Sequence, residues 1–480
     1  MPENFYLQQV INKGDFGSSY LREQTQKTLS NSEFVQTING VSAVTIPADC
    51  YAVVHSAAGD SRIEDHEKYA KSLVENLVAQ SNSFGAIPIG FSNIIDSNSG
   101  DVKMLDLVIN AMVQSADVNK ISILNGENAI LGERVLAEVI LTGTMISMIS
   151  KSKLDISSTS IFCRDGAEYA VFDPENNPIV INSDGVGTKM DFYERIGKPE
   201  LALRDLFAMN LDDAVKLHAK PHVISCAFET NEPALNSQVR KYLQNLSEQI
   251  GVKSTLQCEN AGNRLGGYSK MAFNLNGSAV STIDEKMLHN LPKPKDGNFL
   301  VAIQGKTNPR SNGMTSRRDA IKIVAKSWSN QKNWHLTEKG RCFLEYLAEP
   351  SSILYPLFSD LLDEGLATAV FHLSGGAWNG KLAKPIAKEN LFIAMNTAFK
   401  PDRRDVVFME ALALDAREAY AQWHMGNEGF VSTADPENAI RKIQKFGFRA
   451  ICVGKLQKAK LTKGITFKAF NGEQIHFEGI

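Results

Sequence analysis

The sequence has few of the features that tie a chain together covalently or direct it across a membrane. Its six cysteines are scattered and include no C-x-x-C pair, which excludes the usual zinc motifs and argues against a disulfide framework. The first residues lack the charged-then-apolar pattern of a signal peptide. The most apolar stretch, 135–149, is interrupted by Glu138 and is too short to span a bilayer. We therefore expect a cytoplasmic protein without membrane contact.

Excess charge of one sign is also lacking. The formal net charge is -3, so no general attraction to nucleic acid or to an anionic membrane is expected. The hydrophobic content of 43% is that of an ordinary globular protein, and the length allows two or three domains. These bounds favour a small-molecule substrate over a macromolecular partner.

Strand-like and helix-like runs alternate along the chain and divide it into three segments. In residues 1–150, apolar residues recur at helical spacing between strand-like runs, and the first helix is expected at about 67–80. Residues 155–281 repeat this order of elements. A charged, proline-punctuated linker at 282–298 precedes an α/β region at 299–480. We expect a mixed α/β and α+β fold.

The first two segments share short stretches of sequence at a nearly constant separation. The matches are 126–129 with 258–261, 86–88 with 219–221, and 142–147 with 276–281. We interpret them as traces of an internal duplication, with coincidence as the alternative. Residues 1–150 would then be a degenerate copy of 155–281, preceded by an N-terminal arm. A glycine-bearing loop at 14–19 is a candidate to close over a ligand, although a surface turn is the simpler interpretation.

One stretch, Asp184-Gly-Val-Gly-Thr-Lys189, follows an apolar run and has the composition of a phosphate-binding loop. Its glycines let backbone N–H groups approach an anion, while its acid, hydroxyl and lysine suit Mg²⁺ and phosphate. The residues concerned are Asp184, Gly185, Gly187, Thr188 and Lys189. In the first segment the loop falls on 51–56, or on 57–60 with a short gap, and neither placement offers a lysine. The alternative is a glycine-rich turn with a solvated lysine.

Three further acids can complete such a site. Asp205 and Asp213 lie two turns apart on the helix expected at 199–217, and Asp213 at its end can share Mg²⁺ with Asp184. Glu259 follows a change from apolar to polar residues and is another candidate ligand. Solvated acids at a helix end and a strand end are the plainer interpretations.

Two loops of the last segment place polar residues or glycines directly after a predicted strand. The loop at 308–313 leads into a helix, whose exposed N–H groups favour an anion. The loop at 374–376 repeats this arrangement after His372, which is equally a candidate for a core histidine. The candidate ligand-binding residues are Arg310, Ser311, Asn312, Gly375 and Gly376.

Taken in order, these motifs resemble those of the aminoimidazole ribonucleotide synthetase family, the phosphoribosylformylglycinamidine cyclo-ligases. The resemblance covers roughly 155–478, and its motifs agree in order and spacing. They are Asp184-Gly-Val-Gly-Thr-Lys189, Asp205-Leu-Phe-Ala-Met209 with Asp213, Glu259-x-Ala261, Ser311-Asn-Gly313, Ser374-Gly-Gly376 and Met425-Gly-x-x-Gly429. The wider superfamily includes formylglycinamidine ribonucleotide synthetase, selenophosphate synthetase, thiamine phosphate kinase and a hydrogenase maturation factor.

The resemblance implies a two-domain ATPase that closes the imidazole ring of aminoimidazole ribonucleotide in purine biosynthesis, using ATP and Mg²⁺. It implies catalytic roles for Asp184, Lys189 and Asp213, and Mg²⁺ contacts for Asp184, Asp213 and Glu259. It further implies nucleotide contacts for Asp184, Gly185, Gly187, Thr188, Lys189 and Asp205, and substrate contacts for Arg310, Ser311, Asn312, Gly375 and Gly376. Family members dimerise through their ATP-binding halves into a β-barrel. We therefore expect a homodimer, or a monomer if the N-terminal copy replaces the partner.

The chain departs from the family pattern at several motif positions. Asp212 stands where the family has asparagine, Arg310 stands where it has histidine, and Gly262 replaces the second acid of Glu-x-Ala-Glu. These changes leave two alternatives to the cyclo-ligase. One is a related ATP-dependent enzyme acting on another small phosphorylated or amide substrate. The other is a nucleotide-binding paralogue without catalytic activity.

Overall fold

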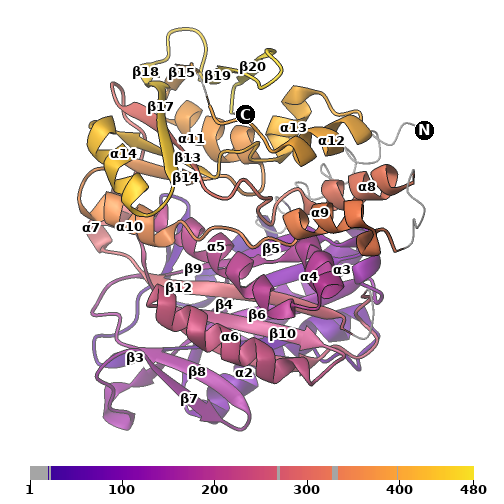
Figure 1. Ribbon diagram of the computed structural model, residues 1–480. Helices are drawn as coiled ribbons and strands as arrows, with labels where there is room; N and C mark the ends of the chain where they lie inside the picture. Colours follow the sequence, from indigo (N-terminus) through magenta and orange to yellow (C-terminus); the bar gives the residue numbers. More distant parts are fainter. Residues whose placement is uncertain (1–19, 21–22, 268–270, 327–332, 397, 480) are drawn as a thin grey trace. The chain divides into compact units, whose positions relative to one another are not determined.

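The computed structural model describes residues 20, 23–267, 271–326, 333–396 and 398–479, so the loop expected at 14–19 lies outside the described residues. The chain divides into two compact units (Figure 1). The N-terminal unit comprises 5–210 and 219–290, and the C-terminal unit contains 211–218 and 291–480. Both segments of the expected duplication fall in the N-terminal unit, except for 211–218 of the second segment.

The N-terminal unit contains two six-stranded sheets with the orders β5-β4-β6-β3-β8-β7 and β1-β2-β9-β12-β10-β11. The central strands of the first are β3 (Cys50–Ala58), β4 (Ile87–Ser97), β5 (Ser122–Ile130) and β6 (Val139–Ser150). Those of the second are β9 (Ile179–Gly185), β10 (Lys220–Thr230), β11 (Lys253–Asn260) and β12 (Phe273–Thr282). Four strands therefore follow one order in both sheets, β5-β4-β6-β3 and β11-β10-β12-β9.

Each sheet is extended by a hairpin that comes from the other segment. The hairpin of β1 (Val35–Ile38) and β2 (Val41–Val44) pairs with β9, and the hairpin of β7 (Ser160–Arg164) and β8 (Ala167–Phe172) pairs with β3. Both junctions are antiparallel. The two segments thus exchange equivalent hairpins within one unit.

Strand register refines the sequence matches. Gly143 on β6 pairs with Asn93 and Ala57, as Gly277 on β12 pairs with Cys226 and Asp184. An alanine of the first segment therefore occupies the place of the loop acid Asp184, in agreement with the short-gap placement of the loop.

The match of 126–129 with 258–261 does not join equivalent positions. Asn93 pairs on its other side with Gly126, whereas Cys226 pairs with Leu256, two residues before Cys258. A shift of β4 against β5 between Phe91 and Ser92 accounts for one of these two residues.

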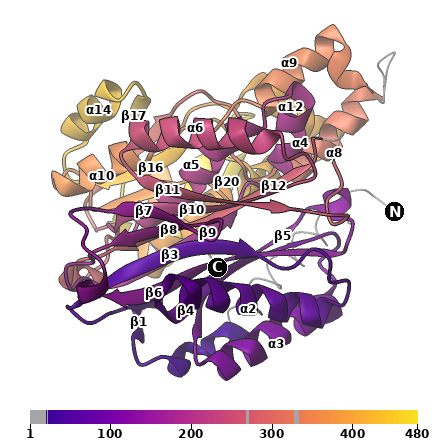
Figure 2. The same ribbon diagram turned by 90° about the horizontal axis from the view of Figure 1, so that it is seen from below.

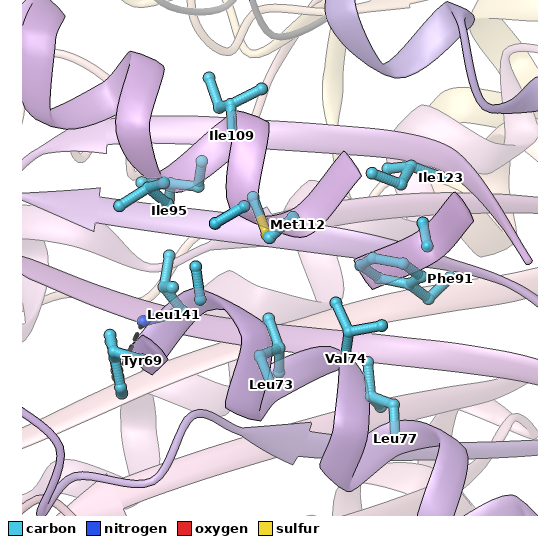
Figure 3. Packing of buried hydrophobic residues seen from close by; sticks show 14 of the residues in the cluster. Tyr69, Leu73, Val74, Leu77, Phe91, Ile95, Ile109, Met112, Ile123 and Leu141 are labelled. Atoms are coloured by element: carbon cyan, nitrogen blue, oxygen red, sulfur yellow. Dashed lines mark hydrogen bonds between the residues drawn. The ribbon is translucent and has the colours of Figure 1, made fainter. Parts of the chain in front are cut away.

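Helices α2 (His66–Phe84) and α3 (Val102–Asn119) pack on the first sheet and form its core. The α2 helix runs beyond the expected 67–80, from the capping side chain of Asp65 to Gly85, whose φ of 87° ends it. Tyr69, Leu73 and Leu77 of α2 face strand residues such as Phe91 and Leu141, all fully buried (Figure 3). Apolar residues that recur every fourth position give α2 one apolar face, and this face packs on the sheet.

On the second sheet lies α6 (Leu235–Ile250), and the strands of both sheets lie between it and the α2–α3 pair (Figure 2). Two shorter elements, η4 (Gly187–Lys189) and α4 (Met190–Ile196), follow β9, and α5 (Ala202–Val215) comes after them. The expected linker, 282–298, is not wholly irregular. It contains α7 (Glu285–His289), whose first N–H groups donate to Asp284 Oδ1.

The C-terminal unit contains sheets of order β14-β16-β13-β17 and β18-β15-β19-β20. The first consists of β13 (Phe299–Gln304), β14 (Ala369–His372), β16 (Gly429–Thr433) and β17 (Arg449–Lys455). The second consists of β15 (Leu391–Met395), β18 (Gln457–Lys458), β19 (Gly464–Lys468) and β20 (Gln474–Phe477). A hairpin predicted to turn at Asn471-Gly472 is confirmed by the antiparallel pairing of β19 and β20.

The helices of this unit are α8 (Met314–Ala325), α9 (Glu338–Leu347), α10 (Tyr355–Asp363), η7 (Trp378–Ala383), α11 (Lys384–Lys388), α12 (Arg403–Ala411), α13 (Ala416–Gln422) and α14 (Pro436–Lys445). Apolar spacing predicts one helix over 405–420, and this is wrong. The chain breaks before Asp415, which forms a capping box with Glu418 and starts α13 afresh. The predicted cap Asp435 does start α14.

Candidate functional site

The loop at Asp184–Lys189 leaves the C-terminal end of β9 and turns directly into η4 and α4. At Gly185 a Cβ atom would lie 2.2 Å from Asn276 Oδ1, so any side chain there would have to displace the Asn276 carboxamide. Gly187 has a φ of 66°, which a side chain would strain. Asp184, Gly185 and Gly187 are partly exposed. The glycines of the motif therefore serve the close backbone geometry that phosphate binding requires.

Lys189 and Asp205 contact each other rather than solvent. Lys189 Nζ lies 2.9 Å from Asp205 Oδ1, and both side chains are fully buried. The Tyr193 hydroxyl also donates to Asp205. A solvated surface lysine is thus excluded. In this arrangement the pair joins the end of the loop to α5, and the two charges face each other inside the protein.

Two more acids lie near the ends of the strands that run parallel to β9. Glu229 at the end of β10 pairs in register with Glu259 at the end of β11. Glu259 is partly exposed and accepts a hydrogen bond from Gln257 at 2.8 Å, whereas Glu229 is buried. Burial raises the pKa of Glu229 to about 8. Asp184, Thr188 and Glu259 thus lie toward one edge of the second sheet, where α/β proteins bind ligands.

Beside this edge lies a buried polar cluster that the sequence analysis does not identify. Asn274 and Asn276 project from β12, and their side-chain N–H groups donate to Asp96 Oδ2 at 2.9 and 2.8 Å. Asn274 also donates to Glu229 at 3.2 Å. Burial raises the pKa of Asp96, and the two asparagines oppose that rise.

Asp213 belongs to the C-terminal unit, where positive groups surround it. Its Oδ1 lies 2.6 Å from His372 Nε2 and 3.3 Å from Lys381 Nζ, and Lys216 forms an ion pair with the same oxygen. Burial alone would raise the pKa of Asp213, but Lys216, Lys381 and His372 hold it well below its usual range. Burial lowers the pKa of His372 to about 3, so this ring is neutral. Two lysines and one carboxylate leave a net positive charge.

Asp212, beside it, pairs with Arg310. The guanidinium Nη2 lies 2.6 Å from Asp212 Oδ2, and both side chains are almost completely buried. Arg310 Nη1 also donates to the Ser352 carbonyl oxygen, and Asp212 Oδ1 accepts from the Leu354 N–H. Arg310 therefore has internal partners, and it does not present its charge to solvent.

The neighbouring residues Ser311 and Asn312 keep polar atoms that have no partner among the described residues. These are Ser311 Oγ and Asn312 Oδ1, while Asn312 Nδ2 donates to the Gln422 carbonyl oxygen. Gly313 ends the loop with a φ of 66°, and a Cβ there would lie 2.4 Å from Trp423. The loop thus contains two buried polar atoms, each able to accept a hydrogen bond, that have no partner among the described residues.

Gly375 and Gly376 form an exposed turn between β14 and η7. Ser374 before them is buried, and its Oγ lies 3.3 Å from His372 Nε2. Lys381 follows in η7 with a quarter of its side chain exposed. The turn and the lysine pair around Asp213 therefore combine backbone and charged donors suited to an anion.

The three acids expected to bind Mg²⁺ are divided between the two units. Among the described residues, no three or more His, Cys, Asp or Glu side chains are arranged to hold a metal ion. Asp184 and Glu259 lie in the N-terminal unit and Asp213 in the C-terminal unit. Two ammonium groups against Asp213 do not fit a cation at that carboxylate. Asp184 and Glu259 remain suited to Mg²⁺ that arrives with a nucleotide, since Mg²⁺ is usually held by one or two carboxylates and phosphate oxygens.

The sequence offered partial signals for the residues that were missed. Lys216 follows Asp213 by three residues on a helix, a spacing that brings side chains together. Asp96 ends an apolar strand run, as Asp184 and Glu229 do, but its asparagine partners come from distant sequence.

None of the described helices is long and apolar enough to cross a membrane.

Comparison with known proteins identifies related sequences. Residues 166–256, which include the Asp184–Lys189 loop, match the family described as AIR synthase related protein, N-terminal domain. The chain is 23% identical over 308 residues to the phosphoribosylformylglycinamidine cyclo-ligase of Carboxydothermus hydrogenoformans, covering 62% of this chain and 84% of that protein. It is 25% identical over 288 residues to the enzyme of that name from Clostridium perfringens, covering 58% and 80%.

Solved structures offer more distant likenesses of fold. Thiamine-monophosphate kinase from Stenotrophomonas maltophilia K279a is 15% identical, with 65% of this chain and 92% of that chain covered at a TM-score of 0.44. Phosphoribosylformylglycinamidine synthase II from Thermotoga maritima is 12% identical, with 67% and 45% covered at a TM-score of 0.40. Neither likeness bears on what this chain binds.

Proposed function

We propose that this chain, whose residues 166–256 match the AIR synthase related family as its motifs predict, is an ATP-dependent cyclo-ligase. Its substrate is formylglycinamidine ribonucleotide and its product aminoimidazole ribonucleotide, in purine biosynthesis. The observation that carries the proposal is the Asp184–Lys189 loop, which lies inside the matched residues, with Asn276 packed closely on Gly185 and a φ of 66° at Gly187.

In this proposal the loop holds the ATP phosphates through its backbone N–H groups and the Thr188 hydroxyl. Asp184 and Glu259 contact Mg²⁺ that accompanies the nucleotide. Lys189 and Asp205 act on the nucleotide indirectly, by fixing the loop through their buried ion pair. Asp213 orients Lys216 and Lys381 instead of binding the metal ion.

The substrate phosphate is assigned to the C-terminal unit. The exposed turn at Gly375-Gly376 supplies backbone donors, and Lys381 supplies charge. Ser311 and Asn312 offer polar atoms for the remainder of the substrate. Arg310 shapes this loop from inside through Asp212.

The chemistry follows from the family resemblance. The amide oxygen of the substrate attacks the γ-phosphoryl group, forming an O–P bond as ADP leaves. The substrate's amine nitrogen then attacks the activated carbon, and phosphate leaves as the ring closes. Such steps need positioning and charge stabilisation more than a protein nucleophile, in keeping with a site built from donors and backbone.

We also propose that residues 1–150 are a degenerate copy of the ATP-binding segment 155–281. The shared strand order and the exchanged hairpins support it. So does a register shift at matching places, between Pro88 and Gly90 and between Pro221 and Val223. In this arrangement the first segment takes the role of a dimer partner.

Turnover measurements test these assignments. We expect phosphate release from ATP with formylglycinamidine ribonucleotide, and its loss in Asp184→Ala. No release with that substrate, but release with another phosphorylated amide, would favour the related enzyme. ATP binding without turnover on any substrate would favour the paralogue without catalytic activity.

A further inference from the structure

Hydroxyl side chains link the two sheets of the N-terminal unit in a palindromic chain of hydrogen bonds. Its order is Ser225, Ser56, Thr144, Ser278, Ser183 and Ser92, with successive oxygens 2.5 to 2.8 Å apart. Ser56 pairs with Thr144 in the first sheet as Ser183 pairs with Ser278 in the second. The central bond, Thr144 to Ser278, marks a local two-fold relation between the segments.

This relation shows which residues near the candidate site are equivalent. Asp96 pairs with Ile140 across the first sheet, and Glu229 pairs with Asn274 at the same distance from the hydroxyl row in the second. Each segment thus supplies one buried acid at the same strand position. In the second sheet the acid Glu229 lies opposite an asparagine, whereas in the first sheet Asp96 lies opposite Ile140. The asparagines of the polar cluster therefore come from the second sheet alone.

Asp96 accepts its hydrogen bonds from the asparagines of the second sheet. It lies in the first segment, is 1% exposed, and accepts from Asn274 and Asn276 of the second segment. Asn276 Nδ2 also contacts Thr142 Oγ1 of the first segment at 3.1 Å. The side-chain N–H groups of Asn276 are therefore held from the first segment.

The carbonyl oxygen of Asn276 points at the loop. It has no hydrogen-bond partner among the described residues, and it lies 2.2 Å from the position of a Cβ on Gly185. Since Asp96 fixes the amide, it also fixes how closely this oxygen packs on the Gly185 backbone.

A second contact from the first segment holds the helix that follows the loop. Arg134 Nη2 donates at 2.7 Å both to Glu194 Oε1 in α4 and to the Phe273 carbonyl oxygen at the start of β12. Leu131 reaches within 3.7 Å of a Cβ position on Gly187. The first segment thus touches the loop, the helix after it and the strand beside it.

We propose that Asp96 is a positioning residue for the Asp184–Lys189 loop, supplied by the first segment to a site formed in the second. The inference rests on the proposed function only in taking this loop as the ATP site. The first segment then contributes directly to nucleotide binding, beyond completing the sheet pair. Removing the Asp96 carboxylate takes away the acceptor that two buried amides share, leaves each with one longer hydrogen bond, and frees Asn276 to move away from Gly185.

The test compares Asp96→Ala and the milder Asp96→Asn in the full chain. In the protein without ATP, we expect faster hydrogen–deuterium exchange in the peptide containing Asp184–Lys189. In turnover assays we expect the KM for ATP to rise about tenfold in Asp96→Ala, the loss typical of a buried charged hydrogen bond, with a smaller change in kcat. Asp96→Asn keeps the shape and one acceptor, so both effects should be smaller; it also serves if Asp96→Ala does not fold.

Ser56→Ala is the matched control. It removes two buried hydrogen bonds of the same pair of sheets, from Ser56 to Ser225 and to Thr144, and neither of them contacts the loop. We expect it to lower the melting temperature while leaving loop exchange and the KM for ATP unchanged. The inference would be overturned if folded Asp96 variants kept the wild-type rate of hydrogen–deuterium exchange in the loop peptide and the wild-type KM for ATP. Equal effects in Ser56→Ala would also overturn it, because they would indicate general loosening. Exchange needs no nucleotide, so a wild-type protein that fails to use ATP would count against the proposed function alone.

Discussion

Lys189 Nζ lies 2.9 Å from Asp205 Oδ1 with neither side chain exposed to solvent. The motif predicts that Lys189 binds phosphate, but in the structure Lys189 forms a buried ion pair with Asp205. The two residues are 16 apart in sequence, and their ion pair joins the loop to α5. Mutation can distinguish the contribution of this ion pair to stability from a contribution of Lys189 to ATP binding.

Lys189→Met should destabilise the protein by about 3–5 kcal/mol, because it leaves the Asp205 carboxylate buried without its cation. The double variant Lys189→Met/Asp205→Leu should recover most of that loss, since no buried charge remains. Urea unfolding of the wild type, both single variants and the double variant measures the difference. A Lys189→Met protein with wild-type stability and lost ATP binding would instead place the ammonium group at the nucleotide.

Lys381→Met and Lys216→Met should each raise the KM for the phosphorylated substrate about tenfold, as expected for a charged hydrogen bond to phosphate. The KM for ATP should stay near its wild-type value, because the proposal assigns these lysines to the substrate phosphate and the ATP phosphates to the Asp184–Lys189 loop. Lys442→Met is the control, since that lysine pairs with Asp360 and Glu364 away from the cluster. The reverse pattern, with only the KM for ATP raised, would contradict the assignment.

The protein should be monomeric. The hydroxyl chain through Ser56, Thr144, Ser278 and Ser183 is closed within a single chain, and the exchanged hairpins complete both sheets without a second copy. Light scattering across a hundredfold dilution should therefore give a constant mass near 52.8 kDa. A constant mass twice as large would show that this pairing of segments does not replace a partner.

Local patterns were enough to predict much of the fold. Apolar spacing predicted α2 and the cap Asp435 predicted α14, because both signals lie within a few residues of the element they start. The break at Asp415 escaped because the apolar spacing continues through it, while the capping box that starts α13 is a weaker signal.

The candidate site was harder to predict, because its partners are distant in sequence. The glycines of the loop were recognisable from composition, but the pairing of Lys189 with Asp205 depends on how α5 packs. Asp96 meets Asn276 only because two sheets face each other, and nothing near residue 96 indicates position 276. Residue types therefore identified the loop, and only the packing showed what holds it.

The buried His55 should make the first sheet sensitive to acid. It lies on β3 with its Nε2 3.1 Å from the Leu77 carbonyl oxygen and its ring 5.2 Å from that of Tyr169. Burial lowers the pKa of His55 to about 4, against the opposing effect of the Leu77 carbonyl. Between that value and the ordinary value near 6.5, the unfolded chain binds a proton that the folded chain does not, so stability falls as the pH falls. From pH 7 to pH 5 this residue should lower the free energy of unfolding by roughly 2 kcal/mol.

His55→Phe removes the titrating group while keeping an aromatic ring against Tyr169, so its unfolding free energy should fall less steeply over the same range. The measurement is urea unfolding at pH 7, 6 and 5 for both proteins. His222 and His372 have lowered pKa values as well, and they stay in both proteins, so only the difference between the two curves reports on His55. Parallel curves would mean that His55 accepts its proton without unfolding the sheet.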